Sequence, residues 1–499
     1  MKLNYKRTIL VGFAFFLISA FWQAYDAIVP LALTNHFGLP QSISGVVMSL
    51  DNILAVFMLP LFGALSDKIM TRFGKRTPFI VLGTIAAVIA FISLTLIDAV
   101  QIKAVLDAGI AERYEAAAAA LKEANLALKE AGKLGNETAI EIARATIKGI
   151  EDNIEQIRVD TLNITLENIW TVIGFVGILL LTLIAMATFR SPAVALMPDV
   201  TVKPLRSKGN AIINLMGTAG GILVLVLGMI FKTSDDKYMQ YTGYVAAVCG
   251  IMLAGLCTFI LTVKERKWAE DMEKQTLDLG IDETAKNDDG IVKRALSKEE
   301  FKSLILILAS VALWYIGYNS ITSKYSVYAT NELFFDYNFT LIVAQAAAVV
   351  AYIPVGIIAS KIGRKKTILA GIVMLASAFF IGNFITFSSP ELVMYPVFAL
   401  AGIGWATINV NSFPMVVELA KGGEVGKYTG YYYTASMAAQ IVAPILSGFL
   451  YDIFGMRAMF FSFGTVFVAL SFVTMFFVKH GDVKPEAQGA LEALAGADD

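Results

Sequence analysis

The chain has 499 residues, of which 57% are hydrophobic and only 16% are charged. Soluble globular chains carry about 25% charged residues, so this composition excludes an ordinary soluble domain. The formal net charge of −1 gives no indication of nucleic-acid binding.

The apolar residues fall into long uncharged blocks, and a helix needs about 20 such residues to cross the hydrocarbon core of a bilayer. Because the blocks are continuous and do not alternate, helices are favoured over barrel strands. Twelve blocks predict an all-α integral membrane protein with two six-helix halves. The first six lie near 9–33, 41–66, 77–98, 168–190, 208–231 and 238–263, and the second six near 303–330, 340–360, 367–388, 392–417, 427–450 and 456–478.

Residues 101–167 follow the third span and carry two apolar stripes with alternating spacings of three and four. Such stripes, separated by the turn residues Gly132–Asn136, predict an antiparallel coiled-coil hairpin. It is either a lid or docking element for another protein, or a passive insertion. The stripes are Tyr114, Ala117, Leu121, Ala124, Leu128 and Ala131, then Ile140, Ala143, Ile147, Ile150, Ile154 and Ile157.

The remaining segments complete the predicted organisation. Residues 1–100 hold spans one to three and residues 168–263 hold spans four to six. A charged linker, 264–302, joins them to the six spans of residues 303–480. The tail, 481–499, is rich in Ala, Gly and Asp and is predicted to be disordered.

Lysine and arginine concentrate in the short loops on one side of the predicted spans. The short loops of the other side hold only Lys232, Lys237 and Arg457. Since cytoplasmic loops carry the positive excess, both termini are predicted to be cytoplasmic and the hairpin extracytoplasmic, in a multi-pass protein of the cell membrane.

The two halves share a motif at matched places. A glycine followed by a short basic loop occurs in Gly63–Arg76, between spans two and three, and again in Gly356–Lys366, between spans eight and nine. Repeated six-span halves are typical of transporters whose substrate binds between them near the midplane. This paired pattern resembles the major facilitator superfamily, and the resemblance covers essentially all spans.

The resemblance implies a charge cluster that holds the cytoplasmic side closed. In that family an acidic residue of the loop and its basic residues pair with an acid at the end of the fourth span. Ser360 stands where the second loop would carry its aspartate. The expected gate residues are Gly63, Asp67, Arg72, Arg76 and Asp199, with Glu418 as the matching acid of the second half.

The first loop and several spans also resemble the sucrose-type and glycoside–pentoside–hexuronide cation symporters. The segments that carry this resemblance are Ser66–Phe79, Phe21–Gln23, Arg190–Asp199, Gly402–Ala406, Asn409–Pro414 and Tyr428–Tyr433. The branch implies uptake of a di- or oligosaccharide with a proton or sodium ion, and it implies a role for Arg190 in sugar binding.

Charges inside the membrane are costly, roughly 2.5–3.5 kcal/mol on insertion scales, so each is a functional candidate. Asp26, Asp51, Arg190 and Lys324 lie within or near predicted spans. Asp26 and Asp51 lie at similar depths, which predicts a carboxylate pair suited to proton or sodium coupling. Asp51 is the expected coupling residue, with Asp26 as its partner or as a sugar acceptor. The alternative is a structural ion pair with Arg190 or Lys324, although Lys324 could also extend outward to the interface.

Sugar binding needs aromatic platforms and neutral amides. The candidates are Trp22, Gln23, Trp314, Tyr318, Asn319, Asn409, Asn411 and Gln440, together with Asp26 and Arg190. Each aromatic residue alone has packing or interface anchoring as its alternative role.

These patterns predict cation-coupled sugar symport by alternating access, without a cofactor, a metal site or enzymatic activity. No nucleotide-binding loop is present. The alternatives are a facilitator or antiporter for another small organic solute, a membrane-embedded enzyme, and a sugar-sensing receptor.

Overall fold

The structure is a computed structural model that describes residues 3–202, 205–278, 297–419 and 425–481. The tail predicted for 481–499 and the centre of the predicted linker fall almost wholly outside these ranges. Over the described residues the regular secondary structure is helical, apart from one isolated bridge between Thr71 and Gly74.

Within the described ranges, twelve helices are long and apolar enough to cross a membrane, which confirms the predicted fold class. In the first half they are α1 (Tyr5–Leu31, continued by the π-helix η1, Ala32–His36), α2 (Gln41–Lys68), α3 (Thr77–Asp107), α6 (Ile169–Asp199), α7 (Arg206–Phe231) and α8 (Thr242–Thr262). In the second half they are α10 (Lys298–Thr322), α12 (Tyr337–Ile362), α13 (Arg364–Gly382), α14 (Met394–Val417, preceded by η4, Glu391–Val393), α15 (Val425–Phe454) and α16 (Met456–Phe476).

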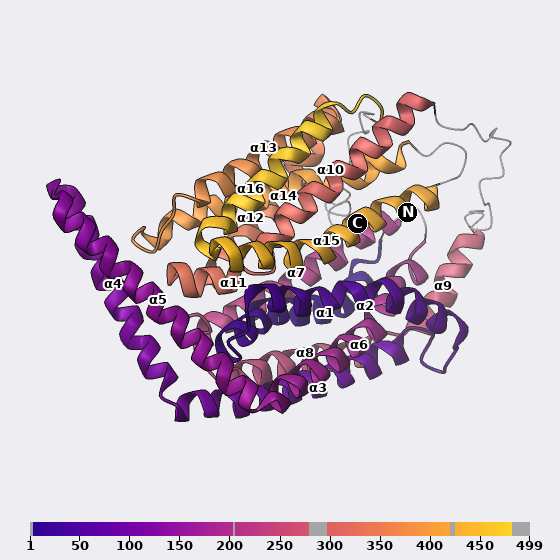
Figure 1. The fold of residues 1–499 in the computed structure, drawn as a ribbon. Helices are drawn as coiled ribbons and strands as arrows, with labels where there is room; N and C mark the ends of the chain where they lie inside the picture. Colours follow the sequence, from indigo (N-terminus) through magenta and orange to yellow (C-terminus); the bar gives the residue numbers. More distant parts are fainter. Residues whose placement is uncertain (1–2, 203–204, 279–296, 420–424, 482–499) are drawn as a thin grey trace.

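The two sequence halves form two groups of helices (Figure 1). Within the first, α1 packs on α7 and α3 on α6; within the second, α13 and α12 pack on α14, and α10 on α16. Between the halves, α2 packs along α15. Large apolar side chains such as Phe57, Leu82, Val350 and Phe384 remain exposed around the periphery, as expected of surfaces that face lipid.

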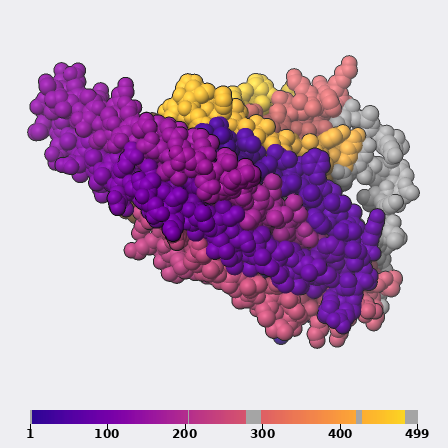
Figure 2. Space-filling view, turned by 60° about the horizontal axis from the view of Figure 1, so that its bottom comes forward, coloured from indigo at the N-terminus to yellow at the C-terminus, as the bar shows by residue number. Residues whose placement is uncertain are grey.

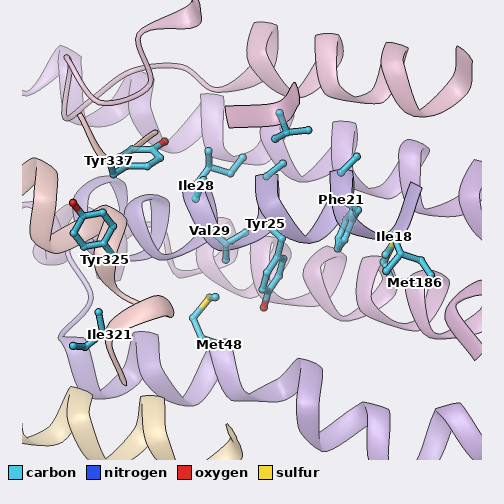
Figure 3. Close-up of a cluster of buried hydrophobic side chains, with 14 of the residues drawn as sticks. Ile18, Phe21, Tyr25, Ile28, Val29, Met48, Met186, Ile321, Tyr325 and Tyr337 are labelled. Atoms are coloured by element: carbon cyan, nitrogen blue, oxygen red, sulfur yellow. The ribbon is translucent and has the colours of Figure 1, made fainter. Parts of the chain in front are cut away.

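The buried core continues from one half into the other. Figure 3 shows Ile28 and Val29 of α1 on one side of Tyr325, Ile321 and Tyr337 of the second half. Close packing of such side chains holds the two halves together where they meet.

The predicted seventh span, 303–330, is the main difference in the helix bounds. Helix α10 ends at Thr322, and the chain continues through Ser323 and Lys324 into the short α11 (Tyr325–Tyr328) and the π-helix η3 (Ala329–Leu333). The break places Lys324 inside the protein, where it is fully buried, and not on a lipid-facing helix surface.

The predicted helical hairpin is present as α4 (Ile110–Leu134) and α5 (Glu137–Glu167). Gly135 makes the turn with φ +63°, and the side chain of Asn136 caps α5 by accepting from the N–H of Ala139 at 3.1 Å. The predicted stripes are buried or half-buried between the two helices. The hairpin projects from one end of the bundle as a rod (Figures 1 and 2). We call this end the hairpin end, and the opposite end, which carries Gly63–Arg76, the motif end.

Candidate functional site

A cavity of about 190 Å³ lies between the halves. Its walls come from α1, α2 and α6 of the first half and from α10, the following turn and α15 of the second. The lining residues are Trp22, Asp26, Met48, Asp51, Asn52, Arg190, Asn319, Thr322, Ser323, Gln440 and Pro444.

Three charged residues of the cavity interact. Asp51 lies close enough to Asp26 and to Arg190 for their charges to act on one another. The carboxylate of Asp51 accepts from the backbone N–H of Asn52 at 2.6 Å and from its side-chain amide at 2.8 Å. With two carboxylates and one guanidinium, the site holds one more acidic than basic group.

Arg190 and Trp22 contact each other in the wall of the cavity. The guanidinium carbon of Arg190 lies 5.5 Å from the centre of the Trp22 ring, which is a cation–π contact. The indole Nε1 of Trp22 and the hydroxyl of Ser323 are buried and have no hydrogen-bond partner among the described residues. Because such groups are costly when unpaired, they are natural partners for a polar ligand in the cavity.

Six of the residues selected from the sequence therefore lie together in this cavity: Trp22, Asp26, Asp51, Arg190, Asn319 and Gln440. Met48, Asn52, Thr322, Ser323 and Pro444 were not selected. Their types carry little chemical signal alone, although each lies within four residues of a selected one on the same chain segment.

The other selected residues do not line this cavity. The side chain of Gln23 accepts from Gln345 of α12 at 2.6 Å, which links the halves elsewhere. Trp314 is fully buried in the core, and Tyr318 stacks on Trp405 with 3.7 Å between ring centres. Asn409 and Asn411 are buried on α14, and the amide of Asn411 donates to the carbonyl of Thr407.

Lys324 corrects the expectation of a side chain that extends outward. Its ammonium is fully buried and donates to the hydroxyl of Ser44, at 2.5 Å, across the boundary between the halves. The break after α10 turns the side chain inward toward α2.

The motif end carries the expected charge cluster around Arg76. Its Nε donates to Asp199 at 2.8 Å and its Nη2 to Asp67 at 2.5 Å, and it also donates to Ser66. These carboxylates raise the pKa of Arg76 against the opposing effect of burial, so the guanidinium stays charged.

The other expected gate residues lie outside the cluster around Arg76. Arg72 lies over the ring of Phe73, at 4.7 Å, and not between Asp67 and Asp199. Glu418 pairs with Arg364 at 2.6 Å within the second half. Gly63 faces α6, where a Cβ would lie 2.8 Å from the hydroxyl of Ser191.

At the motif end, Glu265 also binds the loop that precedes α3, although the sequence pattern did not indicate this residue. Glu265 begins α9 (Glu265–Asp278) and accepts from the backbone N–H groups of Lys75, Arg76 and Thr77 at 2.6–2.9 Å. A carboxylate at this position caps the start of α3 and favours its dipole. The available signal was an acidic residue directly after the sixth span, in an otherwise basic loop.

The halves are joined at the hairpin end. Asp452 of α15 accepts from the backbone N–H groups of Gln41 and Ser42, at 2.7 and 2.8 Å, and Asn331 donates to Asn35 at 2.7 Å. At the motif end, the ion pairs Arg76–Asp199 and Arg364–Glu418 each remain within one half. The cavity is therefore closed toward the hairpin end.

Comparison with known proteins shows which family the chain is similar to. A model described as "Major Facilitator Superfamily" matches residues 334–496, and one described as "MFS/sugar transport protein" matches residues 10–98. An uncharacterized MFS-type transporter, MJ1317 of Methanocaldococcus jannaschii, is 27% identical over 301 residues, covering 58% of this chain and 68% of that protein. The MFS-type transporter ppzB of Metarhizium rileyi is 28% identical over 116 residues, and that match spans only 23% of its length.

Solved structures share the fold at low identity. The xylose transporter XylE from E. coli, in an inward open conformation, superposes with a TM-score of 0.60 at 14% identity, over 98% of this chain and 99% of that one. The nucleoside transporter NupG superposes with a TM-score of 0.53 at 15% identity, over 94% and 99% of the two chains. The two family models match separate parts of this chain, and together with twelve candidate spans among the described residues they make it similar to membrane transporters of the major facilitator superfamily.

Proposed function

We propose that this protein is a secondary active transporter that takes up a di- or oligosaccharide together with a proton or sodium ion, by alternating access. The observation that carries the proposal is the cavity between the halves, in which Asp26, Asp51 and Arg190 meet beside Trp22. The sugar-transport model matches the part of the chain that contains Trp22, Asp26 and Asp51, which supports the substrate class.

Each group of the cavity has a role in this proposal. The indole of Trp22 is a platform for the apolar face of a sugar ring, and the planar fork of Arg190 donates to hydroxyl groups. Asn319, Gln440 and Ser323 supply further hydrogen bonds. Two close carboxylates do not both ionise cheaply in a dry site, so Asp51 and Asp26 take up the coupling cation.

The proposed orientation follows the basic loops: the motif end and both termini face the cytoplasm of a cell membrane, and the hairpin faces outward. The contacts between the halves at the hairpin end then close the cavity toward the outside. The ion gradient drives accumulation, and no cofactor is required.

The test is uptake of labelled sucrose, maltose and xylose into proteoliposomes, with and without inward proton or sodium gradients. The wild type is compared with Asp51→Asn and Asp26→Asn, and Asp107→Asn, an exposed acid outside the cavity, is the matched control. Gradient-driven accumulation that Asp51→Asn loses and Asp107→Asn keeps is the expected result. If no sugar is taken up under any gradient, the proposal is wrong, and a facilitator or antiporter for another solute takes its place.

A further inference from the structure

The turn that leads into α2 is held by the hairpin. We call residues 37–40 the gate turn. Arg158 of α5 donates to the carbonyl of Gly38 at 2.8 Å, and Thr165 of α5 donates to the carbonyl of Phe37 at 2.9 Å. Gly38 has φ +63°, and a Cβ there would lie 2.6 Å from the backbone nitrogen of Leu162. Helix α5 therefore touches the gate turn backbone to backbone.

The second half holds the start of α2 directly after the gate turn. Both carboxylate oxygens of Asp452 accept from the first N–H groups of α2, those of Gln41 and Ser42. One turn further, Ser44 accepts from Lys324. The carboxylate satisfies backbone donors that have no partner inside the helix, and it also favours the positive end of the helix dipole. The hairpin thus holds residues 37 and 38, and the second half holds the residues that closely follow them, 41, 42 and 44.

Charge also links these two sets of contacts. Arg158 is held in place by Glu155, one turn earlier on α5, with donor–acceptor distances of 2.6–3.1 Å. It is close enough to Asp452 for the two opposite charges to attract each other. Arg158 thus contacts the gate turn directly and lies within electrostatic reach of the carboxylate at the boundary between the halves.

The root of the hairpin is fixed to the first half. Tyr114 of α4 packs edge-on against Tyr238 in the loop between α7 and α8, with 5.9 Å between ring centres. The ammonium of Lys237 lies 3.9 Å from the centre of the Tyr114 ring. Gln101 at the end of α3 donates to Thr165 at 2.8 Å. A hairpin anchored in this way moves with the first half.

We propose that the hairpin is a working part of the gate at the hairpin end, with Arg158 as its positioning residue. By fixing the gate turn, Arg158 presents the first N–H groups of α2 to Asp452 and so favours the state closed at this end. Loss of the Arg158 contact loosens the turn, weakens the Asp452 contact, and shifts the protein toward the state open at the hairpin end. The inference rests on the proposed alternating access but not on the identity of the solute.

The test measures the gate directly. In a background with Cys249→Ala and Cys257→Ala, spin labels are placed at Asp235→Cys and Leu392→Cys, which are exposed sites in hairpin-end loops of the two halves. Pulsed electron paramagnetic resonance then gives the distance distribution without added sugar. Arg158→Gln is expected to raise the population of the longer distance at least threefold, and Arg158→Lys, which can still donate to Gly38, to restore most of the wild-type distribution.

Further variants separate the gate role from folding. Thr165→Val removes the second bond to the gate turn, so it is expected to shift the distances in the same direction. Two controls are expected to leave the distances unchanged. The first is Arg144→Gln, at an exposed arginine nearer the start of α5, and the second is removal of the distal hairpin, residues 121–150. Unchanged distances in both Arg158→Gln and Thr165→Val would overturn the proposal, as would an equal shift in Arg144→Gln or the shortened hairpin. Because no transport is measured, failure of sugar uptake does not affect this outcome.

Discussion

The ammonium of Lys324 and the hydroxyl of Ser44 form a hydrogen bond of 2.5 Å between the two halves, and both side chains are fully buried. Lys324 belongs to the break after α10, whereas Ser44 belongs to the first turns of α2. This bond is formed when the hairpin end is closed. Under the proposed alternating access, separation of α2 from the second half exposes the ammonium to water.

Different effects on stability are therefore expected when each partner of this bond is replaced. Lys324→Met replaces a buried charge by an apolar side chain of similar length, a change that is often neutral or stabilising. Ser44→Ala leaves the buried ammonium without its acceptor and is expected to cost about 1–3 kcal/mol. Thermal unfolding in detergent measures both, and an equal loss of stability in the two variants would contradict the prediction.

Arg190 and Trp22 give a prediction for the binding site. Arg190→Lys keeps the charge near Asp51 but removes the planar fork that lies over the indole. Under the proposed function, KM for the transported sugar is expected to rise about tenfold, equivalent to about 1.4 kcal/mol. Uptake kinetics in proteoliposomes measure this change. Trp22→Phe, which retains an aromatic platform, is the milder comparison, and a KM unchanged in Arg190→Lys would remove Arg190 from the sugar site.

The close approach of α2 and α15 gives a prediction for closure. A Cβ at Gly45 would collide with the carbonyl oxygen of Pro444, and neither backbone can move without separating the helices. Gly45→Ala is expected to increase the population open at the hairpin end, measured with the Asp235 and Leu392 label pair. Gly177→Ala on α6 has nothing within 4 Å of the added Cβ and is the matched control. A distribution like that of the wild type in Gly45→Ala would show that the helices can adjust.

The helices were predictable because apolar length and heptad spacing are local properties of the chain. Depth along a helix was also predictable, since each residue adds about 1.5 Å, and this is why Asp26 and Asp51 were expected to be neighbours. The direction that each side chain faces was not predictable. Trp314 and Tyr318 belong to the same helix as Asn319, yet they pack into protein and onto Trp405 because of how α10 meets its neighbours.

Contacts between distant segments could not be predicted from the sequence either. Glu265 caps α3, although nearly 190 residues separate them in the chain. Lys324 reaches Ser44 only because the chain breaks after Thr322 and α2 packs on the second half. Both contacts depend on tertiary packing, which a pattern within one segment does not encode.

Lys237 gives a prediction for pH dependence at the root of the hairpin. Burial lowers its pKa from 10.5 to about 8, although Glu332 and Glu155 oppose that effect. Between about pH 8 and pH 10.5 the lysine of the unfolded chain still binds a proton that the native lysine has lost. The unfolded state therefore binds more protons in this window, and the contribution of Lys237 to native stability rises with pH. Below about pH 8 both forms are charged, and the destabilisation caused by burial is complete.

Lys237→Met removes this titration, so the difference in melting temperature between the variant and the wild type is expected to change with pH. The melting temperature of the variant should exceed that of the wild type by most at pH 7, and this difference should shrink by pH 10. Thermal unfolding at the two pH values in one detergent measures the difference, and Lys232→Met, at an exposed lysine of the same loop, controls for the general effect of pH. A difference that stays constant from pH 7 to pH 10 would mean that Lys237 keeps its proton in the native state, held by the ring of Tyr114 and the two glutamates.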